Sequence, residues 1–263
     1  MIRALFLGLG LFGIAPLLYA ESPSNPCGDN FLNLVDRPTA ADSVCVVPLK
    51  KAVVELGTQY QQLTQSNGNQ VNLPQAVLRF GIPLDNELVL NVPNYSYQTQ
   101  DQPSGFNSPV IGIKHQLAFS TKWVATVESL FTLPAGSPEL GNANLGVAVN
   151  GIINYNLTPK LGLSFMIGAS DQSEAKANGG KRYTSINPDW VLSYALQDKL
   201  SLYGEFYGQS KTAPNEGRGF NADCGLIYLY KPNITFDIEF GQRVNGSLGG
   251  FEHYAGAGMA MLF

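Results

Sequence analysis

The stretch "ITFDIEFGQR", residues 234–243, alternates strictly between apolar side chains and polar, charged or small ones. In an extended strand this alternation places the two kinds of side chain on opposite faces of the sheet. One face carries Ile234, Phe236, Ile238 and Phe240, and the other carries Thr235, Asp237, Glu239, Gly241 and Arg243. A β-sandwich and a membrane β-barrel both contain such strands, so the rest of the sequence has to decide between them.

The last eleven residues, "HYAGAGMAMLF" (253–263), also read as a strand, and neither of its faces is charged after His253. A strand this apolar suits a closed sheet whose outer surface is in lipid. In such a sheet the last strand pairs with the first, so that no open edge remains in lipid. The terminal Phe263 also resembles the signal that bacterial barrel-assembly machinery recognises.

Strand-like segments recur from residue 51 to the end, separated by two kinds of connection. The short connections lie near residues 83, 120, 157, 197 and 231, and the longer ones are rich in Asn, Gly and Ser. An even number of strands, with short turns at one end and long loops at the other, is typical of outer-membrane barrels. We predict twelve strands, at residues 51–64, 73–82, 87–99, 109–120, 122–133, 145–157, 160–170, 185–196, 199–210, 220–230, 234–244 and 253–263.

Two further features favour a membrane barrel. The predicted strands are at least as long as the roughly nine to eleven residues that a tilted strand needs to cross a bilayer, and most soluble strands are shorter. Aromatic residues gather near the predicted short turns, as at membrane interfaces: Trp123, Tyr155, Tyr194, Tyr228, Tyr230 and Phe263. The predicted fold class is all-β: a single transmembrane antiparallel up-and-down β-barrel of about twelve strands, spanning residues 51–263.

Two regions precede the predicted barrel. Residues 1–20 combine one Arg, an apolar run and a small residue at the end, which is the pattern of a secretory signal peptide. Residues 21–50 have no strand or helix periodicity and contain Cys27 and Cys45, which we expect to form a disulfide in an oxidising compartment. This segment is either a periplasmic tail, which we slightly favour, or a plug that folds back into the barrel.

Charge and motifs argue against several classes of function. The formal net charge of −4 gives no basic surface for nucleic acid. After the signal peptide the sequence contains no nucleophile elbow, phosphate-binding loop, Cys-x-x-Cys pair or zinc-protease motif. We therefore predict no catalytic, cofactor-binding or metal-binding residues.

The polar strand faces place charged side chains inside the barrel. The expected lumen-lining residues are Glu55, Arg79, Glu87, Lys114, Glu128, Glu205, Asp223, Asp237, Glu239 and Arg243. Arg79 lies between strands that carry Glu55 and Glu87, which predicts a cross-strand ion pair. Together these charges form either a structural network that fills a narrow barrel or a polar path for solutes. Because acidic groups outnumber basic ones, an open path would favour cations.

One histidine leaves an enzymatic function open. His115 and Ser129 are predicted to face lipid on adjacent strands, as do the histidine and serine of a barrel phospholipase. If the connecting turn centres near residue 121, however, His115 is opposite Val127 and meets Ser129 only diagonally. A nucleophile needs its base within hydrogen-bond reach, so hydrolysis of lipid is the least favoured function.

Several stretches, taken in order, resemble the outer-membrane transporter family of the meta-pathway of phenol degradation. These stretches are "VLRFGIPLDNELVLNVP", "GFNSPVIGIKHQL", "FTLPAGSP", "NYNLTPKLGLSFMIGAS" and "GLIYLYKPNITFDIEFGQRVNGS" with the final "HYAGAGMAMLF". The resemblance runs from about residue 76 to the end. It implies a barrel that transports small molecules, apolar ones among them, and it implies no catalytic residues.

These observations predict a channel or transporter of the bacterial outer membrane that passes a small solute passively. The alternative is a non-conducting barrel that binds a surface partner through its extracellular loops. The expected partners are outer-membrane lipid, the barrel-assembly machinery through Phe263, and a small-molecule solute. We expect no cofactor and no nucleic acid.

Overall fold

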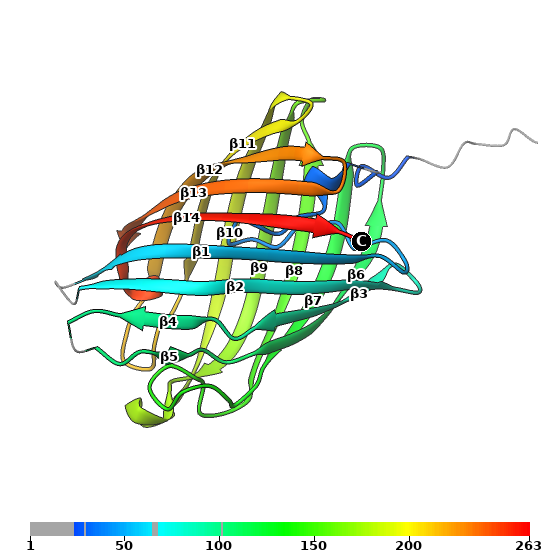
Figure 1. The fold of residues 1–263 in the computed structure, drawn as a ribbon. Helices are drawn as coiled ribbons and strands as arrows, with labels where there is room; N and C mark the ends of the chain where they lie inside the picture. The colour runs from blue at the N-terminus through cyan, green and yellow to red at the C-terminus, as the bar shows by residue number, and fades with distance from the viewer. Residues whose placement is uncertain (1–23, 29, 65–67, 101) are drawn as a thin grey trace, which may run out of the picture.

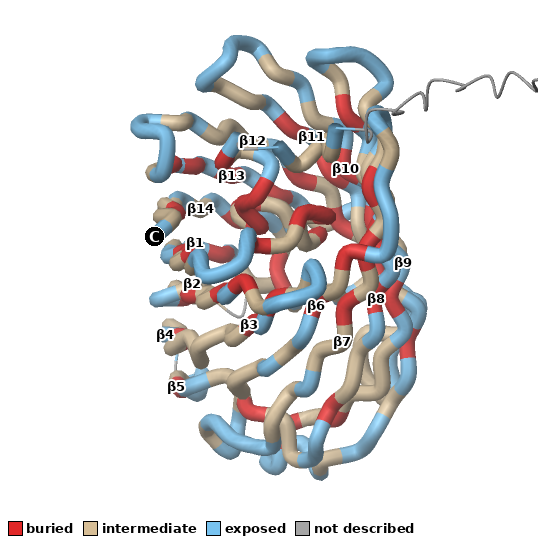
Figure 2. Tube along the Cα trace, turned by 90° about the vertical axis from the view of Figure 1, so that its right-hand side faces the viewer, coloured by how far each residue is buried: buried red, intermediate tan, exposed pale blue. Residues whose placement is uncertain are grey.

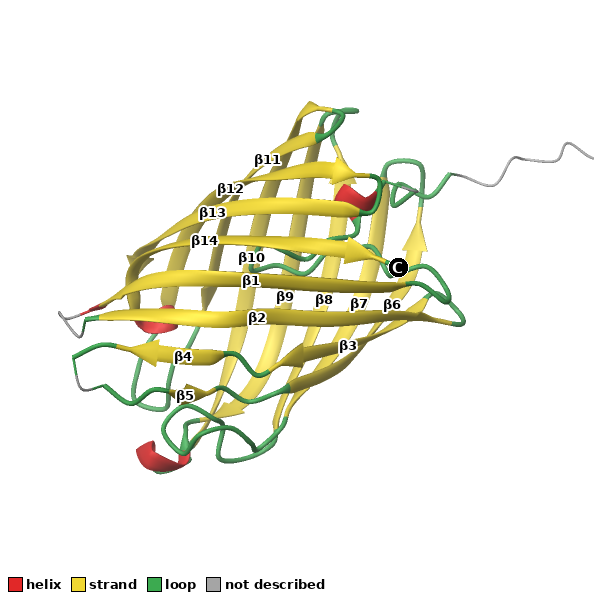
Figure 3. Ribbon diagram, in the orientation of Figure 1, coloured by secondary structure: helices red, strands yellow, loops and turns green. Residues whose placement is uncertain are grey.

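The computed structural model describes residues 24–28, 30–64, 68–100 and 102–263, and its regular secondary structure is almost entirely β-strand (Figures 1 and 3). The expected signal peptide, residues 1–20, lies outside the described residues. The strands are β1 (Ala52–Leu63), β2 (Asn69–Ile82), β3 (Asn86–Val92), β4 (Tyr95–Gln98), β5 (Gly105–Phe106), β6 (Val110–Phe119), β7 (Trp123–Thr132), β8 (Gly146–Asn156), β9 (Leu161–Ser173), β10 (Arg182–Gln197), β11 (Leu200–Gln209), β12 (Gly219–Lys231), β13 (Ile234–Asn245) and β14 (Phe251–Leu262).

The sheet closes on itself because β1 pairs with β2 on one side and with β14 on the other. All of the strand pairings are antiparallel. At the seam the backbone N–H of Phe263 donates to the carbonyl of Ala52 over 2.9 Å. β3 and β4 together form the third strand of the barrel, and β5 and β6 together form the fourth. The predicted closed barrel of twelve strands is therefore confirmed.

The connections follow the predicted asymmetry. The short turns lie between β2 and β3, β6 and β7, β8 and β9, β10 and β11, and β12 and β13, at the end of the barrel where Phe263 also lies. We call this the short-turn end and the opposite end the long-loop end. Because short turns of outer-membrane barrels are periplasmic, the short-turn end corresponds to the periplasmic side.

The strand boundaries differ from the prediction in two ways. The predicted strands 87–99 and 109–120 are each divided or shortened next to a proline, Pro93 and Pro109, because proline has no N–H for the ladder. Other strands are longer than predicted, since β10 has 16 residues and β2 has 14. Their additional residues are mostly polar and lie toward the long loops, where both sides of a strand can meet water.

The outer face of the barrel is apolar over its middle and aromatic near the short turns. Large exposed side chains include Ile238 and Phe240 of the opening stretch. Near the short turns, Tyr155, Tyr194, Tyr228 and Tyr230 are all exposed, as predicted for an interfacial belt. Buried residues instead recur at intervals along the strands of the wall and along the chain inside the barrel (Figure 2). No helix among the described residues is both long and apolar enough to cross a membrane.

Candidate functional site

The N-terminal residues 24–28 and 30–50, here called the luminal segment, lie inside the barrel toward its short-turn end (Figures 1 and 2). Apart from one turn of 3-10 helix at Phe31–Asn33, this segment has no regular secondary structure. The sequence left a tail and a plug open, and the observed position is that of the less favoured alternative. The segment packs apolar side chains against an apolar patch of the inner wall, formed by Val53, Val124, Ile152 and Ala260.

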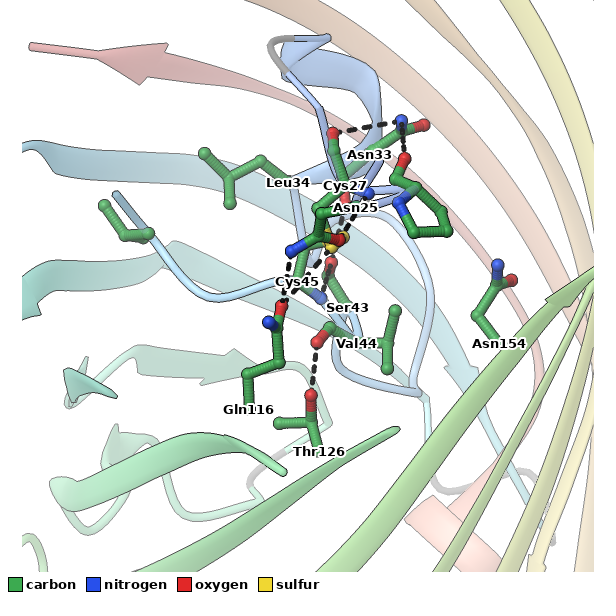
Figure 4. The surroundings of a disulfide bond; sticks show 12 residues. Asn25, Cys27, Asn33, Leu34, Ser43, Val44, Cys45, Gln116, Thr126 and Asn154 are labelled. Carbon is green, nitrogen blue, oxygen red and sulfur yellow. Dashed lines mark hydrogen bonds between the residues drawn. A yellow bond between two sulfur atoms is a disulfide. The ribbon is translucent and has the colours of Figure 1, made fainter. Parts of the chain in front are cut away.

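A disulfide ties the luminal segment into a loop. It joins Cys27 and Cys45, as the cysteine count predicted, with a Cα–Cα distance of 5.6 Å (Figure 4). Beside it, the side-chain amide of Asn25 donates to Gln116 of β6 over 3.2 Å. The hydroxyl of Thr126 on β7 donates to the carbonyl of Val44 over 2.5 Å. The crosslinked loop is therefore fastened to the wall.

Glutamates of the wall accept hydrogen bonds from the backbone of the luminal segment. Glu55 accepts from the N–H groups of Asp36 and Arg37 over 3.0 and 2.7 Å. Glu205 accepts from Ala40 and Ala41 over 2.9 and 2.8 Å. Buried backbone groups must be paired, and an irregular segment cannot pair them internally. The wall carboxylates therefore replace the partners that a sheet or helix would have supplied.

Basic residues of the wall supply the matching donors. Arg79 donates to the carbonyl of Leu34, and also to that of Cys45 over 2.9 Å. Lys114 donates to the carbonyl of Ser43 over 3.1 Å. Because carboxylates meet N–H groups and basic side chains meet carbonyls, the inner wall is complementary to one conformation of the segment.

The predicted ion pair of Arg79 is present and belongs to a larger buried cluster. Arg79 lies 2.9 Å from Glu87 and 3.4 Å from Glu55. Lys114 lies 3.3 Å from Glu87 and 3.9 Å from Glu128, and Asp36 of the luminal segment contacts both cations, at 3.0 and 3.5 Å. Removing one member of such a buried network leaves an unpaired charge and costs about 3–5 kcal/mol.

Arg37 of the luminal segment occupies a niche at the barrel seam. Gly57 of β1 and Gly258 of β14 are register partners, and a Cβ built on either would lie 2.3 Å from the Arg37 side chain. The guanidinium lies 3.1 Å from Asp237 and 3.7 Å from Glu239. The missing side chains of the two glycines thus create the space that lets Arg37 reach both carboxylates.

Asp42 of the luminal segment lies near Glu128 of β7. Desolvation inside the barrel, followed by the negative charge of Glu128, raises the pKa of Asp42 well above its usual range. Lys114 and Arg79 act in the opposite direction but have a smaller effect. The carboxyl of Asp42 is therefore protonated more readily in the docked segment than in water.

A cavity of about 540 Å³ lies between the luminal segment and the wall from β7 to β12. It reaches the short turns, where Pro159 and Asp198 line it. Toward the long loops it extends to an apolar contact that we call the constriction. There Ala41 of the luminal segment packs against Val191 and Tyr203, with Met166 beside them. Space therefore remains between the luminal segment and this part of the wall.

The structure places most of the predicted lumen residues around the luminal segment. All of them except Arg243 are buried on the inner side of the wall: Glu55, Arg79, Glu87, Lys114, Glu128, Glu205, Asp223, Asp237 and Glu239. Arg243 is half-buried near the long-loop end, where it pairs with Glu252 over 2.7 Å. The apolar wall patch and the glycine niche were missed, although inward valines in otherwise polar strand faces were a usable signal.

The histidine considered for catalysis has the register expected from the sequence. His115 pairs with Val127, while Ser129 pairs with Ile113. Among the described residues, no hydrogen-bond partner is present for Nδ1 of His115. The pair therefore lacks the arrangement of nucleophile, base and orienting group that hydrolysis needs.

A closed antiparallel barrel with an apolar outer band and a charged interior is an outer-membrane β-barrel of the bacterial type. The chain belongs to the family described as "Putative MetA-pathway of phenol degradation", whose model matches residues 35–257. This confirms the resemblance found in the sequence. The match also extends it, because it begins inside the luminal segment rather than near residue 76.

Solved structures of low sequence identity share this fold. An outer-membrane channel from Pseudomonas putida F1 is similar with a TM-score of 0.67 and 11% identity, over 86% of this chain and 100% of that one. The KdgM porin has a TM-score of 0.56 and 9% identity, over 80% and 99% of the two chains. The NanC porin has a TM-score of 0.55 and 11% identity, over 78% and 98%. No curated protein matches the sequence.

Proposed function

We propose that this protein is a passive outer-membrane channel whose solute route runs beside the luminal segment. The observation that carries the proposal is the cavity of about 540 Å³ between that segment and the wall. If the luminal segment only closed the barrel, its side chains would be expected to pack against the wall on all sides and leave no such cavity. The solved channel and porins with the same fold support passive conduction as the kind of activity.

The constriction sets the size of the solute. Ala41, Val191 and Tyr203 narrow the route where the cavity ends. The contact is apolar, so uncharged or partly apolar molecules are not excluded by desolvation at this point. The channel is therefore expected to pass small solutes slowly, apolar ones included, and to reject large polar ones.

Planar-bilayer conductance and liposome uptake test the proposal. The wild-type chain should give small, ohmic steps, and Val191→Ala should enlarge them by widening the constriction. Val149→Ala is the matched control, because Val149 of β8 faces outward and is 47% exposed. Deleting residues 24–46 should give the largest conductance. A wild-type barrel and a deletion variant that both give no current and no uptake would contradict the channel.

The second candidate is a non-conducting barrel that acts through its extracellular loops. The apolar contact of Ala41 with the wall favours it, because this contact narrows the route at the end of the cavity. A catalytic role has less support, since His115 is opposite Val127. An assay of lipid hydrolysis with a His115→Ala control tests that role. Assembly through the exposed Phe263 is part of the proposal and is tested by truncating this residue.

A further inference from the structure

Three carboxylates form an acidic cluster on the inner wall, on the long-loop side of the constriction. Asp189 of β10, Glu205 of β11 and Asp223 of β12 come from three neighbouring strands. Glu205 and Asp223 are register partners, and Asp189 pairs with Tyr207, two residues from Glu205. Each of the three is at most 7% exposed. Three acidic side chains are thus gathered in one small part of the lumen.

No basic side chain in the described part of the chain forms an ion pair with this cluster. The other acidic residues predicted to line the lumen each lie within 4.0 Å of Arg37, Arg79 or Lys114. Glu205 has partners of another kind, because it accepts the N–H groups of Ala40 and Ala41 of the luminal segment. Asp189 and Asp223 therefore have no basic partner among the described residues, although Tyr254 donates a hydrogen bond to Asp223.

Acceptor atoms without a donor are concentrated at the same place. The described residues have eight buried side-chain nitrogen or oxygen atoms without a hydrogen-bond partner, and four of the eight belong to Asp189, Asp223, Asn221 and Tyr203. All four residues are more than nine-tenths buried. The atoms are two carboxylate oxygens, an amide oxygen and a phenol oxygen. Buried polar atoms are normally paired, so these four atoms are available to a ligand that brings several donors.

The neighbouring tyrosines are held in fixed positions by glycines. Tyr203 pairs with Gly225 and Tyr254 pairs with Gly241, and a Cβ on either glycine would lie within 2.6 Å of the tyrosine ring. Tyr254 also donates to Asp223 over 2.5 Å. Aromatic rings fixed beside carboxylates are the usual surroundings of a bound organic cation. The site is therefore organised before any ligand arrives.

The spread of the acceptors indicates the shape of the ligand. Among the described residues, no group of His, Cys, Asp and Glu is arranged to hold a metal ion. A planar or tetrahedral cation with several N–H groups can reach oxygens that a single ion cannot. Tyr203 lies between the cavity, which it lines, and the acidic cluster on the long-loop side of the constriction.

We propose that Asp189, Asp223, Asn221 and Tyr203 form a binding site for a small organic cation that carries a guanidinium or alkylammonium group. The proposal deepens the proposed function, because it rests on a solute route beside the luminal segment and adds small organic cations to the uncharged solutes expected there. Binding does not itself require conduction. The two ideas can therefore fail separately.

The test is a calorimetric titration of the full chain in detergent with methylguanidinium, using N-methylurea as an uncharged probe of the same shape. The wild-type chain should bind methylguanidinium and show no binding of N-methylurea. Asp189→Asn should weaken binding about tenfold or more by removing a charge-assisted hydrogen bond. Asp85→Asn is the matched control, because Asp85 is exposed in the turn between β2 and β3 and should leave binding unchanged.

Several results would overturn the site. They are equal heats for both probes, no binding of either, unchanged binding in Asp189→Asn and Asp223→Asn, or displacement of the probe by Ca²⁺ at equal concentration. The comparison of methylguanidinium with N-methylurea uses only the wild-type chain, so it tests the site even if a variant fails to fold. Binding without current in planar bilayers would retain the site and contradict the channel. Current without binding would retain the channel and contradict the site.

Discussion

Gly81→Ala should release the luminal segment without disturbing the barrel. Gly81 lies on β2 where the segment passes into β1, and a Cβ there would lie 2.0 Å from the carbonyl oxygen of Pro48 and 2.4 Å from that of Val47. Side-chain carbons essentially never approach within 3.0 Å of such atoms, so the backbone of the segment must move by about 1 Å. The hydrogen bond from the Val47 N–H to Glu87, 2.6 Å long, would then exceed the usual limit.

The magnitude follows from that lost contact. A hydrogen bond to a charged group contributes about 1.5–3 kcal/mol, and overpacking costs a similar amount. Docking of the segment should therefore weaken by about tenfold to a hundredfold. Hydrogen exchange followed by mass spectrometry should show this as faster exchange of the amides of Asp36, Arg37 and Val47. Planar-bilayer recordings should show a larger mean conductance.

Gly151→Ala is the control for this experiment, because a Cβ on Gly151 of β8 meets nothing within 4 Å. Its exchange and conductance should equal those of the wild-type chain. If Gly81→Ala also leaves both unchanged, the segment is not held as described. Loss of the folded barrel in Gly81→Ala, seen as loss of heat-modifiable migration on gels, would equally refute the reasoning, because the wall is expected to tolerate the methyl group.

Three further predictions concern the same segment. Arg37→Met leaves Asp237 and Glu239 without their cation, so docking of the segment should weaken by about a hundredfold or more, as measured by hydrogen exchange. Arg37→Lys should restore part of the lost docking. Equal exchange rates in Arg37→Met and the wild-type chain would contradict the role of Arg37 in holding the segment. Replacing Cys27 and Cys45 by serine should destabilise the segment by about 2–4 kcal/mol while thermal unfolding of the barrel stays unchanged. Because the pKa of Asp42 is raised on docking, docking should be strongest at low pH and should weaken as pH rises above 3.8, the usual pKa, through the raised pKa. Conductance should therefore increase with pH, and Asp42→Asn should reduce this dependence, leaving the part that comes from Asp36, whose pKa burial also raises.

The strands were predictable because each one carries its own pattern. In "ITFDIEFGQR" the outward Ile238 is apolar because it faces lipid, and the inward Asp237 is polar because it faces the lumen. The short turns were predictable for the same local reason. Ends of strands near the long loops were less predictable, because polar residues there face water on both sides and the alternation disappears.

The position of the luminal segment could not be predicted in this way. Its residues have no periodicity, and its partners are distant in sequence, as with Arg37 and Asp237. The signal lies in the wall instead: Gly57, Gly81 and Gly258 leave space on inner faces where a barrel needs side chains. Such glycines are recognisable only once the register between strands is known. The same limit applies to the acidic cluster, since three strands supply it.

The two sides of the lumen differ in how their charges are used, and this difference suggests where solutes travel. Near β2, β3 and β6, Arg79 and Lys114 neutralise the acidic residues and bind the luminal segment, so little space or free charge remains. Along β10 to β12, Asp189 and Asp223 have no basic partner among the described residues, and they lie on the long-loop side of the constriction, beyond the cavity. The electric field of acidic side chains that lack a basic partner, in a wall of low dielectric constant, attracts cations strongly. The luminal segment is held both by Arg79 and Lys114 and by Glu205 of the acidic cluster. Removing Arg79 should therefore change docking, whereas removing Asp189, which does not bind the segment, should change cation binding.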